Sequence, residues 1–154
     1  MKEFKNFING QFVTTASGKT FENRCPVDNS LIGLVHEAGQ SEVDSAVTAA
    51  KEAMKGPWGN MTQAQRIQLL NKVADRINER FDEFLEAECL DTGKPQKIAS
   101  HIDIPRGAAN FKAFSETLAN HPTEAFKLDT PDGASALNYG HRTPKGVIAV
   151  ISPW

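Results

Sequence analysis

A short apolar segment near the end of the chain constrains the fold more than any other feature. Residues 147–151 read Val-Ile-Ala-Val-Ile and lie between Gly146 and Pro153. Such a run, bounded by glycine and proline, predicts a strand buried on both faces, as in parallel sheets covered by helices. A strand of this kind needs neighbours on its edges and on its faces. Because nothing follows to supply them, we expect an α/β fold with an incomplete sheet, and a chain that is the front part of a longer protein.

Composition excludes several classes of function. The chain has 154 residues, 40% of them hydrophobic, and a net charge of −2, so it has enough apolar residues for a core and no basic surface for nucleic acid. No apolar run approaches the roughly 20 residues of a membrane span, and the N-terminus lacks the apolar region of a signal peptide. Cys25 and Cys89 match no metal or redox spacing, so by default they are small apolar fillers. We expect a cytoplasmic protein with free thiols and without nucleic-acid or membrane partners.

The first part of the chain has the pattern of short strands joined by turns. Asn9-Gly10 between apolar residues indicates a hairpin turn with two positive φ angles. Residues 20–25 and 31–36 read as two further strands separated by a turn. Residues 5–37 therefore predict a small antiparallel β unit.

Apolar residues at helical spacing predict helices between residues 41 and 120. Proline removes a helical hydrogen bond and clashes with the preceding turn, so we expect Pro105 to break or kink the last helix. After it, polar strand-like pieces with a turn between them predict a hairpin or edge ribbon over residues 123–143. The expected helix limits are Ser41 to Gly56, Thr62 to Gly93, and a third start near Gln96.

Several motifs along the chain resemble those of the NAD(P)-dependent aldehyde dehydrogenases. Residues 144–148 (Pro-Lys-Gly-Val-Ile) and 151–154 (Ile-Ser-Pro-Trp) resemble the first strand of that family's cofactor domain, and residues 91–95 (Asp-Thr-Gly-Lys-Pro) resemble a motif at a helix end. The resemblance implies a division into the N-terminal part of the cofactor-binding domain (1–122), an oligomerisation ribbon (123–143), and the truncated first strand of a Rossmann-like sheet (144–154).

The resemblance also implies a reaction. In the family, a cysteine thiolate attacks the aldehyde, a hydride passes to NAD(P)⁺, and a glutamate activates the water that hydrolyses the thioester. Those residues, and the ones that distinguish NAD⁺ from NADP⁺, would lie after Trp154, so we expect this chain to be inactive by itself. Its implied contacts with the cofactor are Ile151, Ser152, Pro153 and Trp154. The full-length enzyme is expected to be a homodimer or homotetramer.

Asp91 has two interpretations. From the residues alone, Gly93 and Pro95 end a helix, and Lys94 faces the negative end of the helix dipole. In the family, the acidic residue at this place helps bind a structural monovalent cation. The resemblance therefore implies a Na⁺ or K⁺ site made by Asp91 and the backbone carbonyls of Asn23 and Arg24.

Arg106 is the candidate residue for substrate binding. One interpretation gives Arg106 no role in binding: it would be a surface arginine paired with Asp103, three residues earlier on the helix. However, Pro105 interrupts the helix beside Arg106, the next residues are small, and a guanidinium binds a carboxylate through two parallel hydrogen bonds. Residues 101–106 resemble the branch of the family that oxidises muconic semialdehydes, in which an arginine here binds the carboxylate far from the aldehyde.

The resemblance therefore implies an enzyme of aromatic meta-cleavage that converts 2-hydroxymuconic semialdehyde into the carboxylic acid. A 2-aminomuconic semialdehyde dehydrogenase is an alternative, because this part of the chain need not read one amino or hydroxyl group. Another semialdehyde or a betaine-aldehyde-type substrate is a further alternative. A different class of function also stays open, in which the chain is a non-catalytic module that mediates assembly.

Overall fold

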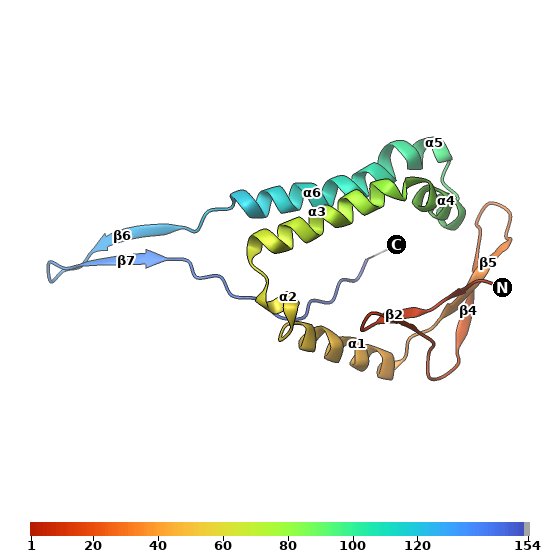
Figure 1. Cartoon of the computed structure of the whole chain (residues 1–154), viewed down its shortest axis with the longest axis horizontal. Coiled ribbons are helices and arrows are strands. Elements are labelled where there is room, and N and C mark those ends of the chain that lie inside the picture. Colours follow the sequence, from red (N-terminus) through yellow and green to blue (C-terminus); the bar gives the residue numbers. More distant parts are fainter. Residues whose placement is uncertain (153–154) are drawn as a thin grey trace.

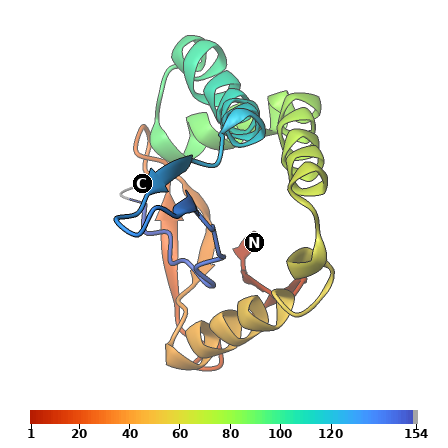
Figure 2. The same ribbon diagram turned by 90° about the vertical axis from the view of Figure 1, so that its left-hand side faces the viewer.

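The computed structural model describes residues 1–152, which form an elongated molecule with short strands at one end and a projecting hairpin at the other (Figure 1). The strands are β1 (Glu3–Phe4), β2 (Asn6–Ile8), β3 (Gln11–Val13), β4 (Thr20–Arg24), β5 (Leu31–His36), β6 (Ala125–Asp129) and β7 (Ser135–Tyr139). The helices are α1 (Gln40–Ala53), α2 (Pro57–Asn60), α3 (Gln63–Glu79), α4 (Phe81–Thr92), α5 (Gln96–Ile98), the π-helical turn η1 (Ala99–Asp103) and α6 (Ile104–Asn120). From the hairpin end, the α3–α6 pair and α1 lie on opposite sides, with β4 and β5 between them (Figure 2).

The N-terminal strands confirm the predicted turn but correct the predicted sheet. Asn9 and Gly10 have φ angles of 51° and 77° and join β2 to β3 in an antiparallel hairpin. β4 and β5 are also antiparallel, but β1 runs parallel to β5, so the unit is mixed. Gly33 permits the pairing of β1 with β5, because an added Cβ there would be 2.7 Å from the carbonyl oxygen of Lys2. Without a side chain there, the first strand can approach β5 closely enough to pair.

Helix α1 begins earlier than the sequence pattern indicated. Its N-cap is Gly39 and not Ser41. The Glu42 carboxylate accepts hydrogen bonds from the backbone N–H groups of Gly39 at 2.7 Å and Ala16 at 2.9 Å. These bonds, that from Ala16 foremost, lower the pKa of Glu42 to about 2. The carboxylate thus fixes the helix start and ties it to the loop after β3.

The region predicted as one helix from Thr62 to Gly93 is two helices. Thr62 caps α3 as predicted, since its hydroxyl accepts from the Gln65 N–H and its own N–H donates to the Gln65 side chain. The helix then stops at Arg80 (φ −105°, ψ 27°), and α4 begins at the next residue. Gly93 ends α4 in the left-handed conformation with φ 71°, as predicted. α1 was predicted to end at Gly56-Pro57, but it ends earlier, at Ala53, with Met54 as its C-cap. Pro57 instead starts α2, because proline suits the first turn of a helix.

The helix does not break at Pro105, but its hydrogen bonding changes just before this residue. Residues Ala99–Asp103 form a π-helical turn that continues directly into α6, and Pro105 lies in the first turn of α6. α6 then packs along α3 through small residues. Ala74, Ala108 and Ser115 are all at most 3% exposed. The position of the first turn of α6 is therefore set by packing against α3 and by the turn before it.

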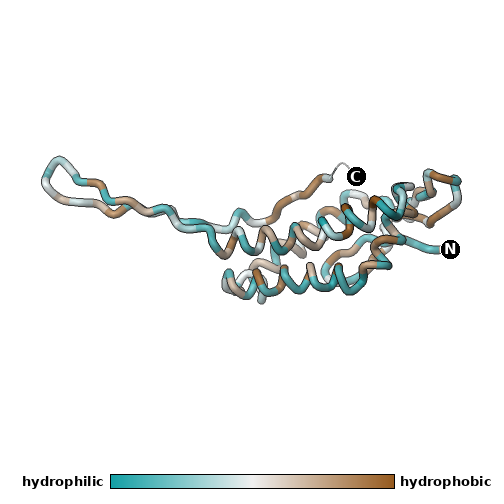
Figure 3. Tube along the Cα trace, turned by 90° about the horizontal axis from the view of Figure 1, so that it is seen from above, coloured by the Kyte–Doolittle hydropathy of each residue, from teal (hydrophilic) through white to brown (hydrophobic). Residues whose placement is uncertain are grey.

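The last two segments of the chain behave differently. β6 and β7 form the predicted antiparallel hairpin, with Ala125 opposite Tyr139. The strand predicted for residues 147–151 does not form, and these residues are an extended coil. The prediction is wrong for this chain because a strand forms only against a neighbour, and no described strand pairs with this segment. Its apolar residues lie as a separate run in Figure 3.

The solvent-accessible area of the chain is large for its mass. The chain has a mass of 16.8 kDa and a solvent-accessible area of 12,034 Å². A folded monomer of this mass exposes roughly 7,600 Å². The excess has the size of a large permanent interface, and it includes apolar side chains such as Ile151 (92% exposed) and Leu137 (72%). A surface of this kind is normally covered by further protein.

Candidate functional site

The Arg106 side chain is exposed on the first turn of α6. Within residues 1–152, no hydrogen bond or ion pair joins its guanidinium to another residue. The structure therefore does not show the ion pair between Arg106 and Asp103 that the first interpretation predicted. Pro105 and Gly107 flank the arginine, and an added Cβ on Gly107 would have nothing within 4 Å. The guanidinium is thus exposed and without a partner among the described residues, so it is available to an external anion.

Asp103 instead pairs with a lysine from a different element. The Nζ atom of Lys94, in the loop after α4, is 3.1 Å from Oδ1 of Asp103 and 3.1 Å from Oε1 of Glu88. Hydrogen bonds to Asp103 first, and to Glu88 second, raise the pKa of Lys94. Sequence reasoning missed this cluster. The only signal was the charge sequence itself, because Lys94 and Asp103 come together only once the chain has turned between α4 and η1.

Asp91 and Asn23, two of the three residues of the predicted cation site, contact each other through their side chains. The Asn23 side-chain amide donates to the Asp91 carboxylate at 2.6 Å across 68 positions of sequence. The register of β4 shifts between Asn23 and Arg24, and a bulge of this kind leaves a residue outside the ladder. Both side chains border a cavity of about 430 Å³ between the sheet and α4. The Na⁺ or K⁺ site at Asp91, Asn23 and Arg24 stays a prediction.

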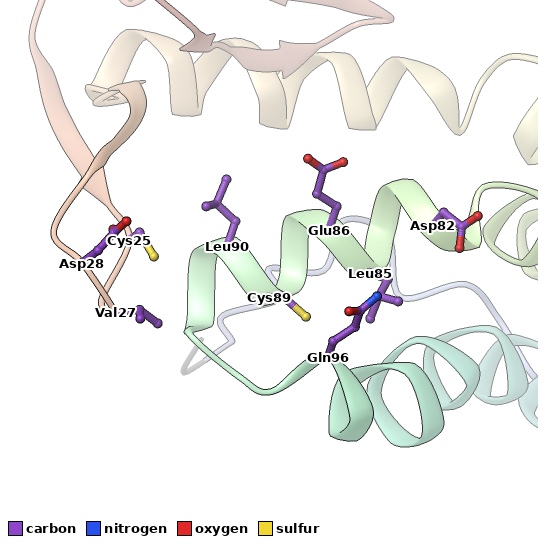
Figure 4. Close-up of a pocket in the computed structure, with 9 residues that line it drawn as sticks. All are labelled: Cys25, Val27, Asp28, Asp82, Leu85, Glu86, Cys89, Leu90 and Gln96. Atoms are coloured by element: carbon purple, nitrogen blue, oxygen red, sulfur yellow. The ribbon is translucent and has the colours of Figure 1, made fainter.

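A second cavity, of about 580 Å³, lies between the loop after β4 and α4 (Figure 4). Both cysteines border it, and both are free thiols. Cys89 packs against the buried cluster of Leu85, Ala99 and Ile104, which agrees with its predicted role as an apolar filler. The lining residues are Cys25, Val27, Asp28, Asp82, Leu85, Glu86, Cys89, Leu90 and Gln96.

The chemistry of this cavity does not fit a nucleophile with its base. None of the lining residues is a histidine. The Asp28 carboxylate accepts hydrogen bonds from the N–H and hydroxyl of Ser30, which lower its pKa and make it a weak base. Among the described residues, no group of three or more histidine, cysteine or acidic side chains could hold a metal ion. We therefore interpret Cys25 and Cys89 as structural residues.

Two of the four residues expected to contact the cofactor are described by the structure, and both are exposed. Ile151 is 92% exposed and Ser152 is also exposed, and Pro153 and Trp154 lie outside the described residues. Val150, the preceding residue, is 85% exposed, so both faces of the segment are open to solvent. In the part of the chain that the structure describes, helices are too short or too polar to cross a membrane.

Known proteins match the chain over nearly its whole length. The family model described as "Aldehyde dehydrogenase family" matches residues 12–154. A 2-hydroxymuconic semialdehyde dehydrogenase from Pseudomonas sp. (strain CF600) is 64% identical over all 154 residues, and a 2-aminomuconic 6-semialdehyde dehydrogenase from Pseudomonas sp. is 49% identical. The chain covers 32% and 31% of these relatives, so it spans about a third of their length.

Solved structures match the fold as well. The NAD⁺ complex of an aldehyde dehydrogenase from Bacillus cereus superimposes with a TM-score of 0.77 and 37% identity, over 81% of this chain and 26% of that one. The matched portion is the N-terminal part of the dehydrogenase structures. Sequence and architecture therefore agree, and the chain belongs to the aldehyde dehydrogenase family.

Proposed function

We propose that this chain is the N-terminal part of an NAD⁺-dependent dehydrogenase that oxidises 2-hydroxymuconic semialdehyde to the carboxylic acid. The identity of 64% to a relative with that name supports the substrate, against 49% for the relative named after the amino compound. The observation that carries the proposal is the state of Arg106. Its guanidinium is exposed and unpaired within the described residues, while the nearest helical carboxylate is held by Lys94.

The proposed role of Arg106 follows from the shape of the substrate. A muconic semialdehyde has an aldehyde at one end and a carboxylate at the other, and the carboxylate is the group whose full negative charge a plain aldehyde lacks. A guanidinium binds a carboxylate through two parallel hydrogen bonds and so fixes both position and orientation. Arg106 is thus proposed to hold the unreactive end of the substrate while the aldehyde reacts at residues outside this chain.

Two other parts of the chain have proposed roles in the full-length enzyme. Residues 147–151 are proposed to become a strand once neighbouring strands cover them, which would bring residues 151–154 to the cofactor. NAD⁺ is the proposed cofactor, with NADP⁺ as the alternative. The β6–β7 hairpin has exposed apolar residues on both faces, including Phe126 (62%) and Leu137 (72%), and is proposed to join subunits of a cytoplasmic homodimer or homotetramer.

A comparison of substrates tests the proposal. The full-length enzyme, meaning the protein that carries this chain and the remaining length of its relatives, would be assayed by NADH absorbance with 2-hydroxymuconic semialdehyde, 2-aminomuconic semialdehyde and hexanal. We expect kcat/KM for the hydroxy compound to exceed that for hexanal by at least about 10-fold, because only the former offers a carboxylate to Arg106.

Each alternative gives a different result in the same assay. A higher kcat/KM for the amino compound would assign the enzyme to that substrate, as the relative with 49% identity suggests. Equal values for hexanal and the hydroxy compound would reject recognition of the carboxylate. The absence of NADH formation with every aldehyde would favour the non-catalytic assembly module.

A further inference from the structure

We propose that Lys94 is a positioning residue that keeps Arg106 available for the substrate by holding Asp103 away from it. The proposal rests on the proposed function, in which Arg106 binds the carboxylate of the semialdehyde. It differs from a purely structural role for the Lys94 cluster, because it assigns a consequence for substrate affinity to a lysine that need not touch the substrate.

Two cations, Lys94 and Arg106, can compete for the carboxylate of Asp103. Asp103 is the last residue of the π-helical turn, and Arg106 follows three positions later on the first turn of α6. Opposite charges at this spacing on a helix are neighbours and normally pair. In the structure the carboxylate is instead 3.1 Å from the Nζ atom of Lys94, and its side chain is 28% exposed.

The Asp103 carboxylate retains the capacity to bind a second cation. Its Oδ2 atom is buried and has no hydrogen-bond partner among the described residues. The loss of its cation would leave this carboxylate partly removed from water and unpaired, which costs free energy. The carboxylate would therefore turn towards the nearest remaining positive charge. Within the same helical surface that charge is Arg106. Glu88, which shares Lys94 at 3.1 Å, would lose the same cation, but it lies on α4 and not on the helix of Arg106.

The size of the effect follows from the strength of such pairs. Exposed helical ion pairs are weak, so an Asp103–Arg106 pair would raise KM for a carboxylated substrate by about 2- to 5-fold. The pair would have to break before the substrate binds, and the reacting groups lie elsewhere. KM should therefore rise while kcat stays unchanged, and a neutral aldehyde should show no change.

The test uses steady-state kinetics of the full-length enzyme with 2-hydroxymuconic semialdehyde and hexanal. Lys94→Met removes the cation and keeps the length of the side chain, and Lys94→Gln is assayed beside it in case the first variant fails to fold. Lys94→Arg keeps the cation, so its KM should stay near that of the unchanged enzyme. Lys97→Met is the control for loss of one positive charge nearby, because Lys97 is exposed and makes no ion pair among the described residues.

The decisive variant is the double substitution Lys94→Met with Asp103→Asn. Since the asparagine cannot pair with Arg106 as an ion, KM for the semialdehyde should return to that of the unchanged enzyme. A purely structural role predicts the opposite, because the cluster stays broken in the double variant. A KM that remains raised there, or one that rises equally for hexanal in Lys94→Met, would overturn the inference.

The proposed function can fail separately. If Arg106→Ala affects both substrates equally, the arginine does not bind the carboxylate and the proposed function fails together with this inference. If Arg106→Ala is selective for the semialdehyde and Lys94→Met has no effect, only the role of Lys94 is rejected.

Discussion

Replacement of Arg106 by alanine in the full-length enzyme is expected to raise KM for 2-hydroxymuconic semialdehyde by about 10- to 100-fold, which is the loss of one charge-assisted interaction. KM for hexanal should stay within about 2-fold, as for other surface substitutions. The reason for this difference is that the guanidinium has no structural partner among the described residues, so its removal breaks no internal contact. NADH absorbance over a range of substrate concentrations measures both constants.

Two further variants make this result specific. Arg106→Lys keeps the charge but not the planar pair of donors, so its KM for the semialdehyde should lie between those of the alanine variant and the unchanged enzyme. Arg76→Ala is the matched control, because Arg76 lies on α3 and pairs with Glu79 at 2.9 Å at the surface. An equal rise in KM for both aldehydes in Arg106→Ala would remove this arginine from the substrate site.

The isolated chain of 154 residues is expected to show no aldehyde-dependent formation of NADH. Neither Cys25 nor Cys89 has a histidine beside it in the cavity that they share, and the pKa of the neighbouring Asp28 is lowered, first by its hydrogen bonds with Ser30. Residues 147–152 are open to solvent. The accessible area of 12,034 Å² also exceeds the roughly 7,600 Å² of a folded monomer of this mass. The same preparation should therefore bind a hydrophobic dye strongly, whereas the full-length enzyme should not.

The control for this measurement is the full-length enzyme at the same molar concentration. Turnover by the isolated chain that depends on both aldehyde and NAD⁺ would mean that a nucleophile and a cofactor site exist within it. That outcome would contradict the assignment of Cys25 and Cys89 as structural residues.

Local signals in the sequence predicted most of the elements. The Asn9-Gly10 turn, the Thr62 cap and the Gly93 helix end each depend on the conformational preference of a residue and its immediate neighbours, and all three are confirmed. A change in the helix near Pro105 was also predictable, because proline lacks the N–H that a helix interior needs, but it takes the form of a π-helical turn and not of a break.

The errors arose where distant parts of the chain decide the structure. The start of α1 was placed at Ser41, but Glu42 bonds to the backbone of Ala16, 26 positions away. β1 was not expected to pair in parallel with β5, a contact that depends on the missing side chain of Gly33. The strand at residues 147–151 had the right composition, but its neighbours are not among the described residues.

The candidate site divides in the same way. Arg106 could be selected from its residue type and its position beside Pro105, and Asp91 with Asn23 could be selected from a motif. The Lys94–Asp103 contact could not, because it forms only through the turn between α4 and η1. The chain's own sequence thus identifies the group proposed to bind substrate, but not the residue proposed to control its availability.

A crystal structure of the full-length enzyme with 2-hydroxymuconic semialdehyde or its carboxylic acid product tests the central claim most directly. We expect the carboxylate remote from the reacting carbon to accept two hydrogen bonds from the Arg106 guanidinium at about 2.7–2.9 Å, with Asp103 still bound to Lys94. A carboxylate bound elsewhere, with Arg106 facing solvent or paired with Asp103, would contradict the account.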